Sequence, residues 1–157
     1  MKPIVTLCIT FATLAQAQPA PLARTTGSFF ALSVADLKAS ARWYSEKFGL
    51  KATLEVPNTN GAAVIVLEGS GLIVELIERD DALPLSKAAQ GITDRLQVHG
   101  IVKAGVIVHD FNKTVQLLKD RGVEIAIGPF PAKGTERANV IVKDNSGNLI
   151  QFFGLRQ

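Results

Sequence analysis

The strongest constraint on the fold of this chain is an internal repeat. Residues 29–36 read FFALSVAD, and residues 103–110, 74 positions later, read KAGVIVHD. In both segments apolar residues alternate along the chain before an Asp, as expected of a half-buried strand that leads into a helix. The chain is therefore expected to contain one structural module twice.

The residues after each Asp predict helices over 37–48 and 111–121, because apolar residues recur there at helical spacing. Asp36 and Asp110 suit the helix starts, since a carboxylate accepts hydrogen bonds from the free N–H groups of the first turn. A glycine follows each range and favours helix termination, because glycine adopts left-handed backbone geometry without strain.

Three candidate strands follow each helix. They are residues 52–56, 63–68 and 72–77 in the first copy, and residues 124–127, 139–143 and 149–153 in the second. The last two flank residues 144–148 (DNSGN), a strong turn signal. The predicted fold class is α+β with two βαβββ modules in tandem. Module one covers 28–78, a polar linker with a short helical turn near 86–90 covers 79–98, and module two covers 99–154.

Alternation within the first strand separates its two faces. Leu32 and Val34 form the face that the helix is expected to cover, and Phe29 and Ala31 lie on the other. Because both modules follow this plan, their helix-free sheet faces are expected to face each other and to enclose a cavity.

The composition limits the classes of function. The 157 residues suffice for one domain, and an apolar fraction of 47% is ample for a packed core. The formal net charge is +3, but Lys and Arg are scattered singly among acidic residues, so no nucleic-acid partner is expected. Cys8 is the only cysteine, which excludes an internal disulfide and a cysteine-based metal site.

Residues 1–17 have the pattern of a secretory signal peptide. Lys2 precedes an apolar run, and Ala15 and Ala17 supply the small residues of a cleavage site. The run is too short to span a bilayer; an N-terminal strand or buried helix is the alternative. Residues 18–27 form a flexible lead-in with two prolines. The domain over 28–157 is thus expected in the periplasm or outside the cell, free of the membrane after cleavage.

Three motifs, taken in order, resemble the vicinal-oxygen-chelate superfamily. They are Phe29-x-x-Leu-x-Val-x-Asp, then Trp43-Tyr44 with Phe48-Gly49-Leu50, and finally DNSGNLIQF over 144–152, which is similar to that family's DPDGN-x-I-E stretch. Members include glyoxalase I, extradiol dioxygenases, fosfomycin-resistance enzymes and bleomycin-binding proteins. The resemblance covers about residues 28–154 and implies paired βαβββ modules that form a half-open barrel around the site.

In metal-using members of that family the ligands occupy four strand positions, which fall here on Phe29, Glu75, Lys103 and Gln151. Only Glu75 is a good ligand, because a phenyl ring has no donor atom, an ammonium has no lone pair and a neutral amide binds metals weakly. The resemblance therefore predicts neither a bound metal nor another cofactor. An ion pair between Glu75 and Lys103 is expected at the vacated site, either to orient an anionic ligand or purely as a structural strut.

Arg137 follows a Gly-Thr-Glu segment and matches a basic feature that lies near the substrate in the family. It is interpreted either as a ligand for a carboxylate or phosphate or as a surface arginine.

These residues favour an exported, metal-free, glyoxalase-like and bleomycin-resistance-like protein that binds a small, anionic molecule in its cavity. One alternative is an enzyme, either a divergent metal-dependent lyase, epimerase or dioxygenase, or one assisted by Lys103. Another is an interaction module whose cavity is filled by side chains such as Phe29. A homodimer is compatible with the sequence, which does not fix the oligomeric state.

Overall fold

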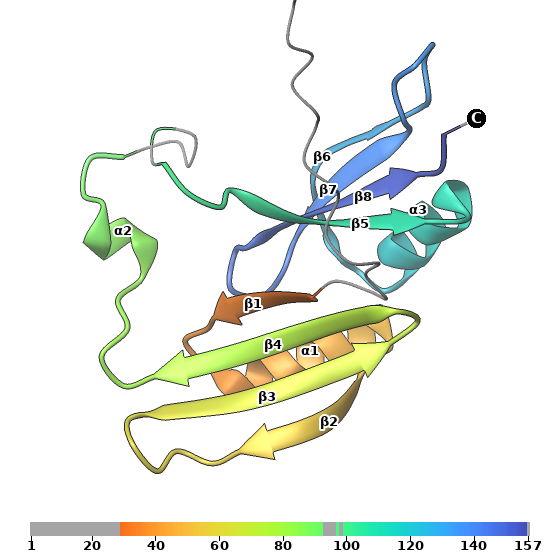
Figure 1. Cartoon of the computed structure of the whole chain (residues 1–157). Helices are drawn as coiled ribbons and strands as arrows, with labels where there is room; N and C mark the ends of the chain where they lie inside the picture. Colours follow the sequence, from red (N-terminus) through yellow and green to blue (C-terminus); the bar gives the residue numbers. More distant parts are fainter. Residues whose placement is uncertain (1–28, 93–96, 98, 157) are drawn as a thin grey trace, which may run out of the picture.

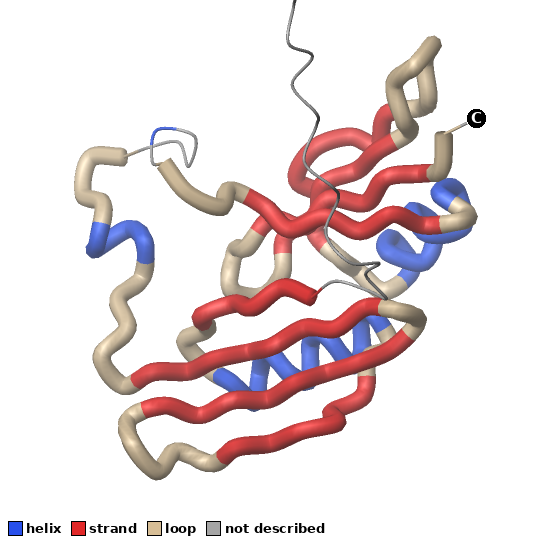
Figure 2. Tube along the Cα trace, viewed as in Figure 1, coloured by secondary structure: helices blue, strands red, loops and turns tan. Residues whose placement is uncertain are grey.

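Two four-stranded sheets, each accompanied by one main helix, make up the structure (Figures 1 and 2). This computed structural model describes residues 29–92, 97 and 99–156, so the predicted signal peptide and lead-in lie outside the described residues. The α+β class and the paired modules are confirmed. Among the described residues, no helix combines the length and the apolar character needed to cross a membrane.

Module one begins at the start of the described chain. It consists of β1 (Phe29–Ser33), α1 (Leu37–Phe48), β2 (Lys51–Val56), β3 (Ala62–Gly69) and β4 (Leu72–Arg79). Its sheet has the order β1-β4-β3-β2, in which β1 runs parallel to β4 and the other pairs are antiparallel. The linker contains α2 (Leu85–Ala88), which overlaps the helical turn predicted near 86–90.

Module two repeats this topology. It consists of β5 (Lys103–Val108), α3 (Phe111–Asp120), β6 (Glu124–Phe130), β7 (Asn139–Lys143) and β8 (Leu149–Gly154). Its sheet has the order β5-β8-β7-β6, and β5 is again parallel to β8. The same succession of elements therefore gives the same strand order in both halves of the domain.

Both main helices begin as the sequence predicts. The carboxylates of Asp36 and Asp110 each accept a hydrogen bond from the backbone N–H three residues later, at 2.8 and 2.9 Å. Gly49 ends α1 with a φ of 73°, in the left-handed region that favours glycine. The first N–H of α1, from Leu37, donates to the Glu78 carboxylate at 2.8 Å. That second cap joins the helix to the end of β4.

Helix α1 packs against both modules. Tyr44 is fully buried, and its hydroxyl donates to the Asp144 carboxylate in the β7–β8 turn at 3.0 Å. The rings of Phe48 and Phe152 lie edge to face with centroids 5.5 Å apart. Buried side chains of the two modules thereby form one continuous hydrophobic core. This helix is the main element that holds the modules together.

The side of each sheet that carries no helix is called here its open face. Phe29 and Glu75 lie on the open face of module one, and Lys103 and Gln151 lie on that of module two, since their strand neighbours point into the core under the helices. The two sheets do not close into a barrel (Figure 1). Apolar side chains on the open faces consequently remain accessible, with Phe29 64% and Ile107 57% exposed.

Candidate functional site

Strand pairing relates the four candidate positions to one another. Phe29 is the first residue of β1, and Lys103 is the first residue of β5. Glu75 lies opposite the residue two positions after Phe29, and Gln151 lies opposite the residue two positions after Lys103. The register therefore makes Phe29 equivalent to Lys103 and Glu75 equivalent to Gln151, as the sequence repeat predicts.

The predicted ion pair between Glu75 and Lys103 is not formed within the chain. Both ion pairs found among the described residues involve other side chains. Lys103 is exposed and Glu75 is half-buried. The two charges lie on different sheets that do not close, so water reaches both, and an exposed pair would contribute little stability in any case.

Gln151 has a different environment from Glu75. Its side chain is only 7% exposed, although it lies on the open face. The amide nitrogen donates to the side-chain oxygen of Asn139 in the neighbouring strand β7 at 3.1 Å. This contact fixes the orientation of the amide and satisfies a buried polar group, which would otherwise destabilise the sheet.

The donor atoms on the open faces do not fit the metal that metal-using members of the family bind at these positions. Glu75 is the only carboxylate among the four positions; Gln151 is bonded to Asn139, and Lys103 brings positive charge. The described residues contain no group of three or more His, Cys, Asp or Glu side chains arranged to hold a metal ion. A divalent cation would find one anionic ligand and one repelling ammonium.

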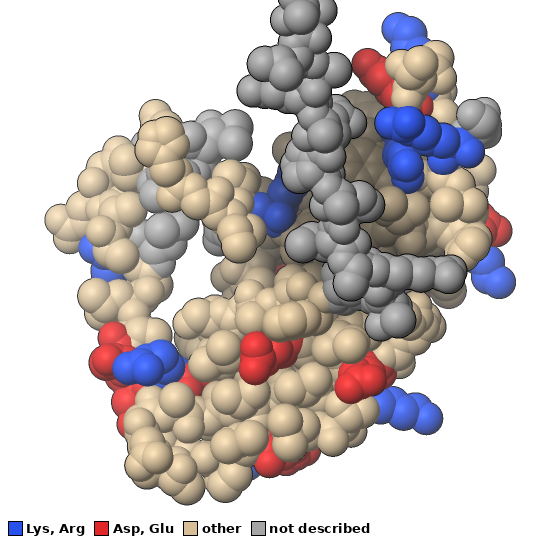
Figure 3. All heavy atoms as spheres, viewed as in Figure 1, with Lys and Arg blue, Asp and Glu red and all other residues tan. Residues whose placement is uncertain are grey.

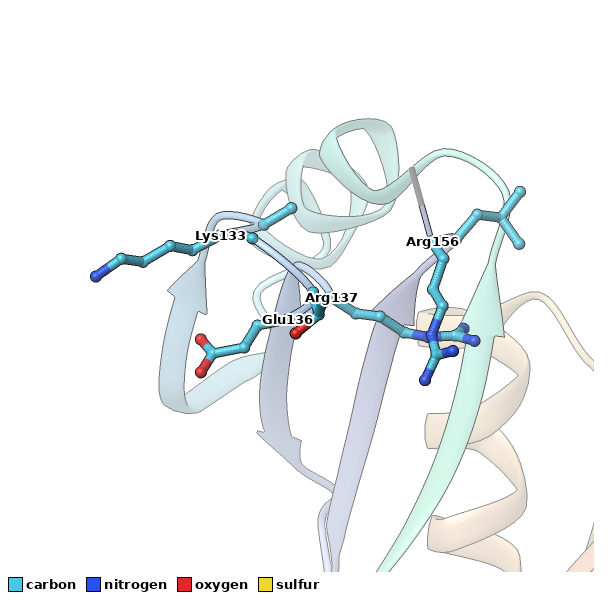
Figure 4. Close-up of a pocket in the computed structure, with 8 residues that line it drawn as sticks. Lys133, Glu136, Arg137 and Arg156 are labelled. Carbon is cyan, nitrogen blue, oxygen red and sulfur yellow. The ribbon is translucent and has the colours of Figure 1, made fainter.

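A second candidate site lies at the outer end of module two, between the β6–β7 loop and the end of β8 (Figure 4). Arg137 is half-buried there, and its Nη1 donates to the carbonyl of Gly154 at 3.4 Å. Arg156 and Lys133 line the same pocket, which has a volume of about 330 Å³. The sequence indicates Arg137 but carries no signal for Arg156, because only the β7–β8 pairing brings the two arginines to one pocket.

Charge is distributed unevenly over the molecule. Figure 3 shows acidic side chains over β3 and β4, and basic side chains over β5 and near the C-terminus. On the open faces, Glu68 lies opposite Lys51, and Lys143 is paired with Glu124 at 2.7 Å. Glu75 of module one and Lys103 of module two form no ion pair among the described residues, so these two side chains give the open faces opposite charges.

Residues 27–152 match the profile of the Glyoxalase/Bleomycin resistance protein/Dioxygenase superfamily. Because the match covers most of the chain, the protein belongs to this superfamily, and the resemblance seen in its motifs is confirmed. A comparison with curated proteins finds no match.

Several solved structures are similar to this one. A glyoxylase/bleomycin resistance protein/dioxygenase domain from Frankia sp. EAN1pec has a TM-score of 0.66 at 18% identity, over 86% of this chain and 95% of that one. A glyoxalase family protein from Enterococcus faecalis has a TM-score of 0.64 at 14% identity, over 80% and 94%. TnmS3, an antibiotic binding protein from Streptomyces sp. CB03234, has a TM-score of 0.58 at 17% identity, over 85% and 98%. Identities this low show a shared fold alone.

Proposed function

We propose that this protein is an exported, metal-free member of its superfamily that binds a small anionic molecule at the open faces of its two modules. The observation that carries the proposal is the set of side chains at the four matched positions, where Lys103 is an accessible cation and only Glu75 is acidic. An ammonium donates directly to a carboxylate, phosphate or carbonyl oxygen. Lys103 would thus supply the positive charge that a metal supplies in other members.

Apolar side chains around these positions suit the body of such a ligand. Phe29, Ile107 and Ile127 are 64%, 57% and 50% exposed, and all three lie on the open faces. Covering such surface stabilises a complex by roughly 25 cal/mol per Å² of apolar area removed from water. The similarity in fold to TnmS3, which binds an antibiotic, supports a binding role for this architecture.

A second copy of the chain is the partner expected to cover the open faces. Glu75 on the open face of module one is opposite in charge to Lys103 on the open face of module two, and neither forms an ion pair among the described residues. A two-fold axis would apply this contact twice, because the same two patches occur on each protomer. Glu75 of one protomer would then meet Lys103 of the other and enclose the ligand.

Charge reversal tests this dimer. Glu75→Lys or Lys103→Glu alone should weaken association, and the double reversal should restore it, because the pair keeps its opposite charges. Light scattering coupled to gel filtration would follow the mass. A wild-type protein that is monomeric at all accessible concentrations would contradict the expectation.

The ligand itself is tested by native mass spectrometry of protein purified from its own host. The wild type should retain a small anionic compound, and Lys103→Met should lose it. Lys119→Met is the matched control, since Lys119 is an exposed lysine on α3 of the same module. Equal retention by Lys103→Met and wild type would remove Lys103 from the site and the proposal with it.

A metal-dependent lyase, epimerase or dioxygenase is the second candidate function, and Glu75 favours it. This carboxylate keeps the type and position of a family ligand and is half-buried, with no ion pair among the described residues. Elemental analysis after purification without chelator separates the two functions. A stoichiometric transition metal that is lost in Glu75→Gln would establish the enzyme and contradict the metal-free site.

Export is tested at the N-terminus of the protein in its own host. Cleavage after Ala17 should give a mature chain that begins near Gln18. Sequencing of the N-terminus would report this directly, and a full-length chain in the cytoplasm would contradict export.

A further inference from the structure

The pocket at the outer end of module two has a well-defined backbone frame. Lys133 and Glu136 exchange two backbone hydrogen bonds, of 3.2 and 2.9 Å, which close a tight turn in the β6–β7 loop. The backbone N–H of Gly154 donates to the carbonyl of Ala138 at 2.9 Å and fixes the end of β8 against the start of β7. The side chains around the pocket therefore project from two ordered segments.

Positive charge predominates among the residues that line this pocket. Lys133, Arg137 and Arg156 are cationic, and Glu136 is the only acidic residue. Within the described part of the chain, none of these four takes part in an ion pair. Figure 4 shows the Glu136 carboxylate and the Lys133 ammonium both directed away from the two guanidinium groups, which reach the same side of the pocket. Two cations at one pocket repel each other unless an anion lies between them.

Arg137 is already held in place for such a contact. It is half-buried, and one of its N–H groups donates to the carbonyl of Gly154 at 3.4 Å. A guanidinium has five N–H donors, so this single contact leaves donors for a ligand. Arg156 is exposed and approaches from the chain end just after β8. Little side-chain ordering of Arg137 is then required when an anion binds.

We propose that this pocket is an oxyanion-binding site, in which Arg137 and Arg156 together bind a carboxylate or phosphate group. A planar guanidinium pairs two of its N–H groups with two oxygens of such an anion, and two guanidiniums neutralise a dianion. Lys103 pairs with the first residue of β8, whereas Arg156 follows its end, a separation of roughly 20 Å along the strand direction. The pocket thus lies at the opposite end of β8 from Lys103, and this proposal does not require a ligand at Lys103.

Inorganic phosphate and acetate are the probes, each titrated into the full chain at constant ionic strength with chloride as the reference. The side-chain Nε–H signals of Arg137 and Arg156 are followed by ¹H–¹⁵N NMR. Both signals should shift saturably. Arg137→Gln or Arg156→Gln should weaken binding about tenfold or more, the loss expected for one charged hydrogen-bonding partner. Arg42→Gln, at an exposed arginine on α1, is the matched control and should bind as the wild type does.

The outcomes separate the sources of the anion and test the site. Tighter binding of phosphate assigns a phosphate group, and tighter binding of acetate assigns a carboxylate. Arg156→Gln changes an exposed residue outside the strands and helices, so its effect on binding is not confounded by a loss of folding. Equal shifts with chloride, unchanged affinity in either single variant, or an equal loss in Arg42→Gln would overturn the proposal.

Discussion

The two modules share a topology but differ in the helix that each contributes. Helix α1 carries Trp43, Tyr44 and Phe48, whose rings contact one another at centroid distances of 5.0 to 5.3 Å. At the position of Trp43, 74 residues later, α3 has Leu117, which is 40% exposed. A repeated backbone thus does not imply a repeated role: the aromatic face of α1 packs between the modules, whereas α3 meets module one at its C-cap, where Arg121 donates to the carbonyl of Lys47 at 2.8 Å.

The turn before the last strand also differs between the modules, but here module two supplies the groups that make the contact. In module two the buried Asp144 accepts hydrogen bonds from Tyr44, from the backbone of Ser146 and from both the backbone and the side chain of Asn148. In module one the strand register places Gly69, which has no side chain to accept hydrogen bonds, at the position of Asp144. Module one therefore contributes an aromatic helix to the interface, and module two contributes a polar turn that accepts it.

Tyr44→Ala should have the largest effect on stability. It removes a fully buried ring from the interface, and such truncations of large aromatic side chains typically cost ~3–5 kcal/mol. Leu117→Ala, on the exposed side of α3, should cost less than ~1 kcal/mol. Urea unfolding followed by the fluorescence of the single tryptophan, Trp43, would measure both. Similar losses in the two variants would show that the modules are stabilised alike.

Asp144→Ala should have the next largest effect. It leaves the buried Tyr44 hydroxyl without its acceptor, and an unsatisfied buried donor typically costs ~1–3 kcal/mol. Glu68→Ala, at an exposed position near the end of β3, should stay within ~0.5 kcal/mol of the wild type. In a double-mutant cycle with Tyr44→Phe, the loss from Asp144→Ala should shrink, and full additivity would contradict a direct contribution of this hydrogen bond.

The same contact predicts an alkaline limit to stability. Burial raises the pKa of the Tyr44 hydroxyl well above its usual range, and the nearby Asp144 carboxylate raises this pKa further. The folded protein thus keeps a proton that the unfolded chain loses above pH about 10, so this contribution is complete below pH 10 and falls above it. Because Tyr44 is the only tyrosine, absorbance at the phenolate band reports its ionisation alone.

Tyr44→Phe is the control for this pH dependence. Its stability should fall less steeply in alkali than that of the wild type, by up to ~1.4 kcal/mol per pH unit. Parallel alkaline curves for the two proteins, or phenolate absorbance that appears at the usual pH without unfolding, would contradict the buried hydrogen bond.

Lys103→Met should have the smallest effect on stability. Lys103 is exposed and forms no ion pair among the described residues, so the free energy of unfolding of the monomer should change by less than ~0.5 kcal/mol. The loss of a buried strut would instead cost ~3–5 kcal/mol. Unfolding should be measured at dilutions that exclude self-association, so that only the monomer contributes. A large loss of unfolding free energy in Lys103→Met would then show that Lys103 stabilises the fold rather than binding the ligand.

Many helix and strand positions could be predicted, because they depend on sequence patterns within a few residues. The helix predicted over 37–48 coincides with α1, and the strand predicted over 139–143 coincides with β7. Strand β6 extends beyond the predicted range of 124–127, since Phe130 still pairs with Asn139 of β7. Periodicity fixes where an element lies and which face is apolar, but the partner strand decides where pairing stops.

The candidate sites, like the backbone, could be predicted only in part. The repeat alone placed Phe29, Glu75, Lys103 and Gln151 at equivalent strand positions, because side chains alternate strictly along paired strands. It did not indicate that Gln151 would be buried while Lys103 remains exposed. Burial depends on the neighbouring strand and on how far the two sheets approach each other.

The sequence by itself determined the two modules, their helix caps and the chemistry available on each strand face, since these follow from contacts within a few residues. Only the tertiary structure decided that Tyr44 meets Asp144 across 100 positions of sequence, and that Glu78 caps α1. It also decided that Arg137 and Arg156 share a pocket. Such contacts depend on how separate segments pack, and packing depends on the shape of all the buried side chains together, which no local pattern encodes.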